Sequence, residues 1–470
     1  MHNVPNQSGF HIKFFSSNLL HKAIIVISTL VVLLAGVQIM GFGGAVNTGD
    51  YLRVFQSMSI VVPGWQPLAL HYHLFNSANP IPPESIMAGL GWVLNELCLV
   101  FRVNYFPTWL ISLVLFSIYV GGMIALARLR SWRSDIILII SLITFMAYGF
   151  YIRSLYEEAI LVSLAPILAF FGLRYDGRIT GSFLVIVGLL VILSKAEMVF
   201  AAPLLLYGLY LGRMSKKFII QAIILIIVTG AYAGYLARHG GMRPVNNYNR
   251  YYNGIGYSVF HSSSWPVRTF NGRLAYFYDN HVRFEDEART LNLPGSVGLW
   301  GTSYWPTGAN ISKLAWEADA TPEVKERVLA TVNKGSLVQY FGYLVVSPRV
   351  VVSIIKNAIL TAFTANYSLV YIRNPMPAPW SLSGLSVMVA LNFFQACAFL
   401  AGLCMLLSRS WKHCCVCVYF IIGGPIFVVM GDGYFEFEKH LAPILMLLPF
   451  VVSLVLRDGY RKELSRVMSD

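Results

Sequence analysis

The sequence predicts an all-α polytopic membrane protein, and three observations lead to this fold class. Hydrophobic residues make up 56% of the 470 residues, charged residues make up 12%, and the mean hydropathy is +0.62. This is too little charge to cover the surface of a soluble protein of this size. Many apolar segments reach the roughly 17–25 residues that an α-helix needs to cross the hydrocarbon core. Basic residues, finally, cluster between alternate segments.

Ten apolar segments are predicted to span the membrane, which gives a bundle of about ten transmembrane helices. They are residues 22–42, 106–127, 134–152, 159–174, 179–196, 198–212, 217–237, 382–407, 414–430 and 439–456. Two further segments, 84–103 and 349–372, are apolar enough to compete with these ten. The hydropathy alone therefore leaves the number of spans open.

The positive-inside rule decides between these segments, because the Lys and Arg of short loops lie mainly in the cytoplasm. When only the ten spans are counted and the N-terminus is cytoplasmic, every basic short loop becomes cytoplasmic. These loops contain Arg128, Arg130 and Arg133; Arg174 and Arg178; Arg213, Lys216 and Lys217; Arg409 and Lys412; and Arg457, Arg461, Lys462 and Arg466. Counting 84–103 or 349–372 as a span inverts several of them. We therefore predict two amphipathic helices on the outer membrane surface; a tilted span is the alternative for one of them.

This topology divides the chain into three parts. They are an N-terminal transmembrane bundle (1–237) that includes the first outer loop (43–105), one large outer segment (238–381), and C-terminal transmembrane helices (382–470). Both termini are then cytoplasmic, and the net charge of +13 is explained by cytoplasmic loops that meet anionic lipids. No basic stripe with interleaved aromatic residues predicts nucleic-acid binding, and the six cysteines show no disulfide or zinc spacing.

Four clusters of charged residues follow apolar segments, where charge is costly unless it has a function. They are Asp50 with Arg53, Glu157 with Glu158, Lys195 with Glu197, and the C-terminal hairpin with Asp432, Glu436, Glu438, Lys439 and His440. The predicted topology brings all four clusters to the outer face, so we predict one shared polar site there. Structural alternatives are a helix N-cap for Asp50 and snorkelling of Lys195 to the membrane interface.

The order of these features resembles the GT-C superfamily of membrane glycosyltransferases, which transfer a sugar from a polyprenyl-phosphate carrier outside the cytoplasmic membrane. The matching elements are Gly49-Asp50 in the first outer loop and Ser154-Leu155-Tyr156-Glu157-Glu158 at the start of a later span. Bacterial surface-glycan hexose transferases are the most similar subgroup. The chain resembles them at Ser194-Lys195, at Asp432-Gly433 with Glu436 and Lys439-His440, and at Tyr343-Leu344 with Pro348.

The resemblance implies an enzyme whose donor is a polyprenyl-phosphate-linked sugar and whose acceptor is a glycan or a lipid-linked glycan. An inverting transfer needs a base for the acceptor hydroxyl, and Asp50 is the predicted catalytic base. The leaving lipid phosphate needs cations, which Lys195, Lys439 and His440 are predicted to supply.

The remaining predicted binding residues are Arg53, Glu157, Glu158 and Glu436, which bind sugar hydroxyls or orient those cations. Asp50 lacks the neighbouring carboxylate that often accompanies it in the family, so no cofactor is predicted and a divalent metal is not indicated. The polyprenyl tail would enter from the membrane lipids along the outer-surface helices.

Two other function classes compete with the glycosyltransferase. A surface-polysaccharide polymerase or ligase would use outer-loop arginines such as Arg243, Arg250, Arg268 and Arg273 to hold a pyrophosphate. A transporter or flippase would place ionisable residues in the middle of broken helices, whereas the predicted spans have few charges in their interiors. The sequence favours the glycosyltransferase of the cytoplasmic (inner) membrane, with its active site on the outer face.

Overall fold

The computed structural model describes most of the predicted helices but little of the predicted outer segments. The described residues are 18–40, 71–73, 85–103, 105–153, 156–174, 178–211, 216–239, 348–364, 393–407, 411–432 and 437–467. The regular elements in these residues are helices except for two short strands, β1 (His71–His73) and β2 (Tyr105–Pro107), which pair antiparallel. The prediction of a helical fold is therefore confirmed for the described part of the chain.

Six helical stretches are long and apolar enough to cross a membrane, as expected of a polytopic membrane protein. They are Leu19–Gly36, Trp109–Ala127, Trp132–Ile152, Ile219–Leu236, Trp411–Val429 and His440–Arg457. The first four lie in α1 (Asn18–Met40), α4 (Thr108–Ala127), α5 (Trp132–Tyr148) with η2 (Gly149–Arg153), and α9 (Lys216–His239). The fifth combines α20 (Trp411–Val418), η5 (Tyr419–Gly423) and α21 (Gly424–Asp432), and the sixth combines α22 (Phe437–Met446) with α23 (Leu448–Val467).

The other four predicted spans are shorter helices in the described residues. They are α6 (Glu158–Leu173), α7 (Arg178–Ile192), α8 (Ala201–Leu211) and α19 (Phe393–Leu407), of 16, 15, 11 and 15 residues. The 3₁₀-helix η3 (Ala196–Phe200) precedes α8 and takes up the first part of the predicted span 198–212. Six helical stretches of the described residues are thus long enough to span a membrane, and the count of ten remains a prediction.

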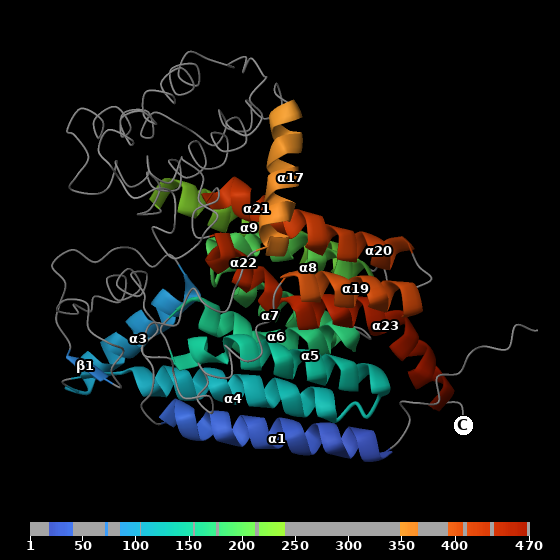
Figure 1. Ribbon diagram of the computed structural model, residues 1–470. Coiled ribbons are helices and arrows are strands. Elements are labelled where there is room, and N and C mark those ends of the chain that lie inside the picture. Colours follow the sequence, from blue (N-terminus) through green and yellow to red (C-terminus); the bar gives the residue numbers. More distant parts are fainter. Residues whose placement is uncertain are drawn as a thin grey trace, which may run out of the picture.

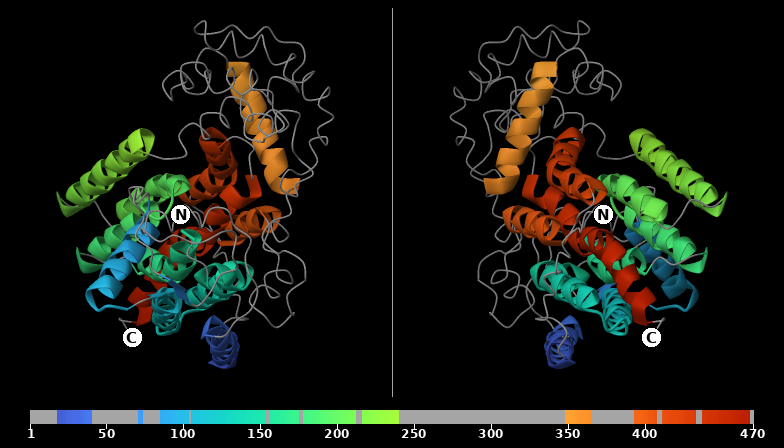
Figure 2. Two further views of the ribbon diagram at one scale, coloured as in Figure 1. Left: turned by 90° about the vertical axis from the view of Figure 1, so that its left-hand side faces the viewer. Right: turned by 90° about the vertical axis from the view of Figure 1, so that its right-hand side faces the viewer.

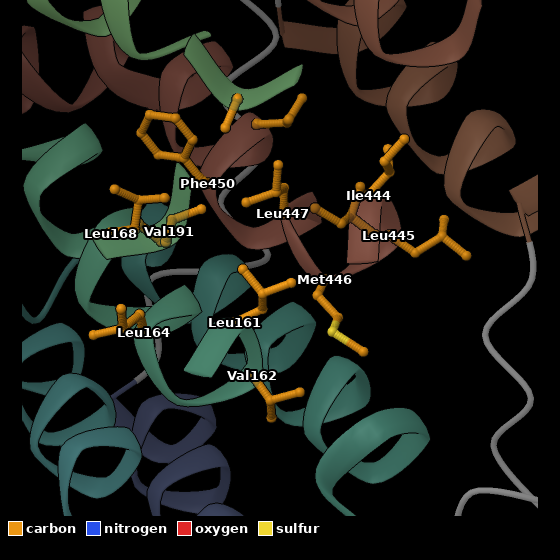
Figure 3. Packing of buried hydrophobic residues seen from close by; sticks show 14 of the residues in the cluster. Leu161, Val162, Leu164, Leu168, Val191, Ile444, Leu445, Met446, Leu447 and Phe450 are labelled. Carbon is orange, nitrogen blue, oxygen red and sulfur yellow. The ribbon is translucent and has the colours of Figure 1, made fainter. Parts of the chain in front are cut away.

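Helix α6 is the centre of the bundle. It packs against α4, α5, α7 and α23, and the helices run side by side along one direction (Figure 1). Figure 3 shows Leu164 and Leu168 of α6 gathered with Val191 of α7 and Phe450 of α23. Gly172 allows this close approach, because a Cβ atom there would lie 2.2 Å from Ser453 Oγ and 3.0 Å from the Phe450 ring.

Helices α22 and α23 together form one interrupted helical stretch inside the bundle. Pro449 ends α22 because its ring would clash with the carbonyl of Leu445, and Pro is well tolerated in the first turn of the following helix. The chain tightens at the break, where Leu447 N–H donates to the Ile444 carbonyl at 3.0 Å. Of the residues in His440–Arg457, 94% are buried, so this stretch lies inside the bundle.

Two further helices, α3 (Ile86–Val100) and α17 (Pro348–Thr364), correspond to the segments predicted to lie on the outer surface. Helix α17 runs across the direction of α4, α5 and α6, and it is still seen along its length when α1 is viewed end-on (Figures 1 and 2). It contacts α19 and α21, with Ala358 and Ala362 buried and Val352 and Leu360 exposed. A helix that lies along a membrane surface would have this transverse direction, and the location at the outer surface stays a prediction.

Candidate functional site

A cluster of buried charged side chains, here called the charged cluster, lies where α6, η3 and α22 begin. Its members are Glu158, Lys195, Glu197 and His440. Glu158 is the first residue of α6, Lys195 precedes η3, Glu197 lies within η3, and His440 is in the first turn of α22. Helix α22 contacts both η3 and α6, which brings together residues that are far apart in the sequence.

Hydrogen bonds and ion pairs join the four side chains into one chain. Lys195 Nζ donates to Glu158 Oε1 at 2.5 Å and lies 3.5 Å from Glu197 Oε1. The same Glu197 oxygen is hydrogen-bonded to His440 Nδ1. Glu197 therefore shares one carboxylate oxygen between a lysine and a histidine, and the order along the chain is Glu158, Lys195, Glu197, His440.

The three residues other than His440, which is partly buried, are almost completely shielded from solvent. Glu158 is 1% exposed, Lys195 6% and Glu197 7%. A buried charge is strongly unfavourable unless an opposite charge and hydrogen bonds compensate it, so each member depends on its neighbours. Removal of one member would leave another charge without a partner.

Lys195 lies in the connection between α7 and η3, and its charge is stabilised by carboxylates. Burial alone would lower the pKa of Lys195, but the charges of Glu158, Glu197 and Glu157 outweigh this effect and hold the pKa well above its usual range. Glu157 precedes α6 and is buried as well. The charged form of the Lys195 side chain is therefore favoured by its carboxylate neighbours.

The turn that positions Lys195 is fixed by local hydrogen bonds. Ser194 Oγ donates to the Val191 carbonyl at 2.6 Å, at the end of α7. Lys195 itself has extended backbone angles (φ −156°, ψ 149°) as the residue that begins η3. Its carbonyl accepts from Met198 N–H at 2.9 Å, so the short 3₁₀-helix starts immediately and keeps Lys195 and Glu197 close together.

Of the predicted site residues, the structure brings together Glu158, Lys195 and His440, with Glu157 close enough to act on the charge of Lys195. Lys439 precedes His440 in α22, and its side chain is not among those described. The predicted base Asp50, together with Arg53 and Glu436, lies outside the described residues. The same holds for Ser154, for Tyr343-Leu344 and for the four arginines of the predicted large outer segment.

The predicted set of binding residues omits Glu197, which has two partners in the charged cluster. The available signal was its position two residues after Lys195, in a hairpin with little loop between two apolar segments. Lys195 was expected to bind a phosphate, and in the structure its ammonium group faces two carboxylates. A phosphate would have to compete with these carboxylates, so Glu158 and Glu197 suit the predicted task of orienting cations.

Within the part of the chain that the structure describes, no group of three or more His, Cys, Asp or Glu residues could hold a metal ion. The charged cluster offers cationic and anionic hydrogen-bonding groups at one end of an apolar bundle, where a polar headgroup and a hydrocarbon tail could be bound together. Comparisons with protein-family models, curated proteins and solved structures found no match.

Proposed function

We propose that this chain is a membrane glycosyltransferase with a GT-C-like bundle of about ten transmembrane helices. In this proposal it transfers a sugar, a hexose, from a polyprenyl-phosphate donor to a surface glycan or a lipid-linked acceptor. The observation that carries the proposal is the charged cluster, because residues 158, 195, 197 and 440 converge at one end of apolar helices. An enzyme for a lipid-linked anionic substrate needs buried charge next to an apolar surface.

The distribution of basic residues supports an outer location for this site. Helix α6 begins in the charged cluster and ends at Leu173, directly before Arg174, and α4 ends directly before Arg128. The helix ends that adjoin short loops rich in Arg are cytoplasmic by the positive-inside rule. In this proposal α6, α7, α8 and α19 are counted as short spans, both termini are cytoplasmic, and the charged cluster faces outward.

The proposed reaction has one bond-forming and one bond-breaking event. The acceptor hydroxyl oxygen bonds to the anomeric carbon while the bond from that carbon to the phosphate oxygen breaks, with inversion. Asp50 takes the hydroxyl proton, and the bonding electrons leave with the polyprenyl phosphate. His440 and Lys439 stabilise the charge on this phosphate, and Glu197 with Lys195 holds His440 in position.

The remaining residues bind the sugar in this proposal. Arg53, Glu157 and Glu436 offer hydrogen bonds to its hydroxyl groups, and Glu158 orients Lys195. A transporter is disfavoured because buried charges in the described residues lie near the ends of the apolar stretches, as with Asp135 in the first turn of α5 and Arg457 at the end of His440–Arg457. The polymerase or ligase alternative depends on arginines outside the described residues.

The test is transfer of labelled sugar by the full-length protein in phospholipid vesicles. Polyprenyl-phosphate-linked glucose, galactose and mannose serve as donors, and a glycolipid and polysaccharide extract of the producing cells serves as acceptor. We expect one donor to give a labelled product with a single added sugar and an equal amount of free polyprenyl phosphate. Transfer of many sugars would instead identify a polymerase, and absence of both donor binding and transfer for all three donors would refute the proposal.

Two variants connect the transfer to the charged cluster. Glu158→Gln removes the anion next to Lys195 and should reduce transfer about a hundredfold, as displacement of a positioning group typically does. Glu463→Gln removes the same charge near the far end of α23 and should leave transfer unchanged. Equal activity of Glu158→Gln and Glu463→Gln would show that the charged cluster does not contribute to the reaction.

A further inference from the structure

A cavity of about 610 Å³ lies between α8 on one side and α20 with η5 on the other. Helix α8 lines it from Pro203 to Tyr210, and α20 with η5 lines it from Trp411 to Tyr419. None of its lining residues belongs to the charged cluster. Its volume is in the range of roughly 300–1,000 Å³ that is common for small-molecule sites.

The rim of this cavity carries a positive charge and aromatic residues. Lys412 Nζ donates to Tyr210 Oη at 3.1 Å and lies 5.0 Å from the centre of the Tyr210 ring. This contact leaves further N–H protons on Lys412 and the O–H proton of Tyr210 as donors to an anion. Trp411, which is largely exposed beside them, adds an indole of the kind that lies at membrane headgroups.

The deep part of the cavity is apolar. Its walls there include Pro203, Leu204 and Val416. Tyr419 closes this end, and its hydroxyl donates to the Phe200 carbonyl at 3.0 Å while its ring stacks on Phe200. The polar atom at the deep end is therefore engaged, and the cavity favours a hydrocarbon chain over a polar molecule.

The length of the cavity matches part of one membrane leaflet. From Pro203 to Tyr210 a helix rises about 10 Å, whereas half of the hydrocarbon core is about 15 Å. The rim lies at the end of the helices where Lys and Arg are concentrated, next to the loops that contain Arg213 and Arg409 in the sequence. This end faces the cytoplasmic leaflet, whose surface is rich in anionic lipids.

We propose that this cavity is a binding site for an anionic phospholipid of the cytoplasmic leaflet. The phosphate of the lipid binds Lys412 and Tyr210 at the rim, and the upper part of one acyl chain lies between α8 and α20. The lipid is distinct from the proposed sugar donor, because the donor would bind at the opposite end of the bundle. This inference stands whether or not the chain is a glycosyltransferase.

The first experiment compares an anionic and a zwitterionic lipid with the same acyl chains. Delipidated full-length protein is mixed with dioleoyl phosphatidylglycerol or dioleoyl phosphatidylcholine, and retained lipid is counted by native mass spectrometry. We expect phosphatidylglycerol to be retained preferentially. Lys412→Gln should weaken its retention about tenfold, the effect of losing one charge-assisted hydrogen bond, and Lys412→Arg should preserve it. Lys22→Gln removes a charge from exposed α1 and is the matched control.

The second experiment locates the acyl chain from the alkylation rates of two adjacent cysteines in the unsubstituted protein. Cys415 lines the cavity and Cys414 does not, although both are exposed. Phosphatidylglycerol should slow alkylation of Cys415 by N-ethylmaleimide and leave the rate at Cys414 unchanged, as read by peptide mass spectrometry. Equal retention of the two lipids, an unaffected Lys412→Gln variant, or equal protection of both cysteines would overturn the proposal. If Lys412→Gln fails to fold, the cysteine rates in the parent protein decide.

Discussion

The two ends of the bundle bury charge in different ways. In the charged cluster, Glu158, Lys195, Glu197 and His440 form a connected chain with a shared carboxylate oxygen. At the opposite end, two interactions of buried charged residues that the structure describes have no residue in common. There His21 Nδ1 pairs with Asp135 Oδ1 at 2.6 Å, and fully buried Arg457 donates from Nη1 to the Gly208 carbonyl at 2.8 Å.

This difference indicates what each end requires. Separate contacts hold one helix to another, as His21 holds α1 to α5 and Arg457 holds α23 to α8. A connected chain couples its members, so that a change at one residue alters the charge and position of the next. Coupling of this kind suits a site where a ligand must act on several groups at once, and the following predictions test this contrast.

The largest expected effect separates the proposed base Asp50 from Asp135, a carboxylate that the structure describes in a contact between helices. Asp50→Asn should reduce sugar transfer roughly a hundredfold to ten-thousandfold, because the proposed base can no longer accept a proton. Asp135→Asn should retain transfer, because Asp135 serves the contact between α1 and α5. Initial rates at equal amounts of membrane-inserted protein provide the measurement. Full activity of Asp50→Asn would return this residue to the alternative role of a helix N-cap.

A second prediction concerns stability at the charged cluster. Lys195→Met leaves Glu158 and Glu197 buried without their cation and should destabilise the protein by about 3–5 kcal/mol. Thermal unfolding in detergent, followed by proteolysis at each temperature, measures the loss. Combining Lys195→Met with Glu158→Gln should recover part of it, because the unpaired charge is removed. Strictly additive losses in the double variant would show that the cluster is not coupled.

At the opposite end, His21→Gln should have a smaller effect. The pair with Asp135 is partly buried, and its loss should cost about 1 kcal/mol, the usual contribution of a single hydrogen bond. Gln can still donate to Asp135, so the same thermal proteolysis should show a modest shift. A loss as large as that of Lys195→Met would remove the distinction between the two ends.

The smallest effect on the protein is expected from a test of orientation. Ser262→Cys and Ser303→Cys should react with an impermeant maleimide added outside intact cells, and Ser215→Cys should not. These changes should leave transfer and stability unaltered, since all three positions lie in predicted loops. Native cysteines are first replaced by Ser so that only the introduced thiol reports. Labelling of Ser215→Cys from outside would contradict the predicted orientation, because the end of the bundle assigned to the cytoplasm would then face outward.

The helical class was predictable because it depends on composition and on segments such as 134–152, which the structure has as α5 with η2. Span lengths were less predictable near Lys195, because a 3₁₀-helix and a tight turn replace part of the regular helix that hydropathy suggested. The cluster was predicted as a meeting of charged segments. The order in which its side chains contact one another was not predictable from the sequence. The contact between Glu197 and His440 joins residues 243 positions apart, and local sequence patterns do not encode such a pairing.

The packing of α23 against α6 also has a consequence for biogenesis. Gly172 accommodates Ser453 and Phe450, and the stretch His440–Arg457 follows all the other apolar helices described in the chain. The face of α6 around Gly172 therefore lacks its packing partner until almost the whole chain has been synthesised, so this pairing is one of the last contacts of the bundle to form.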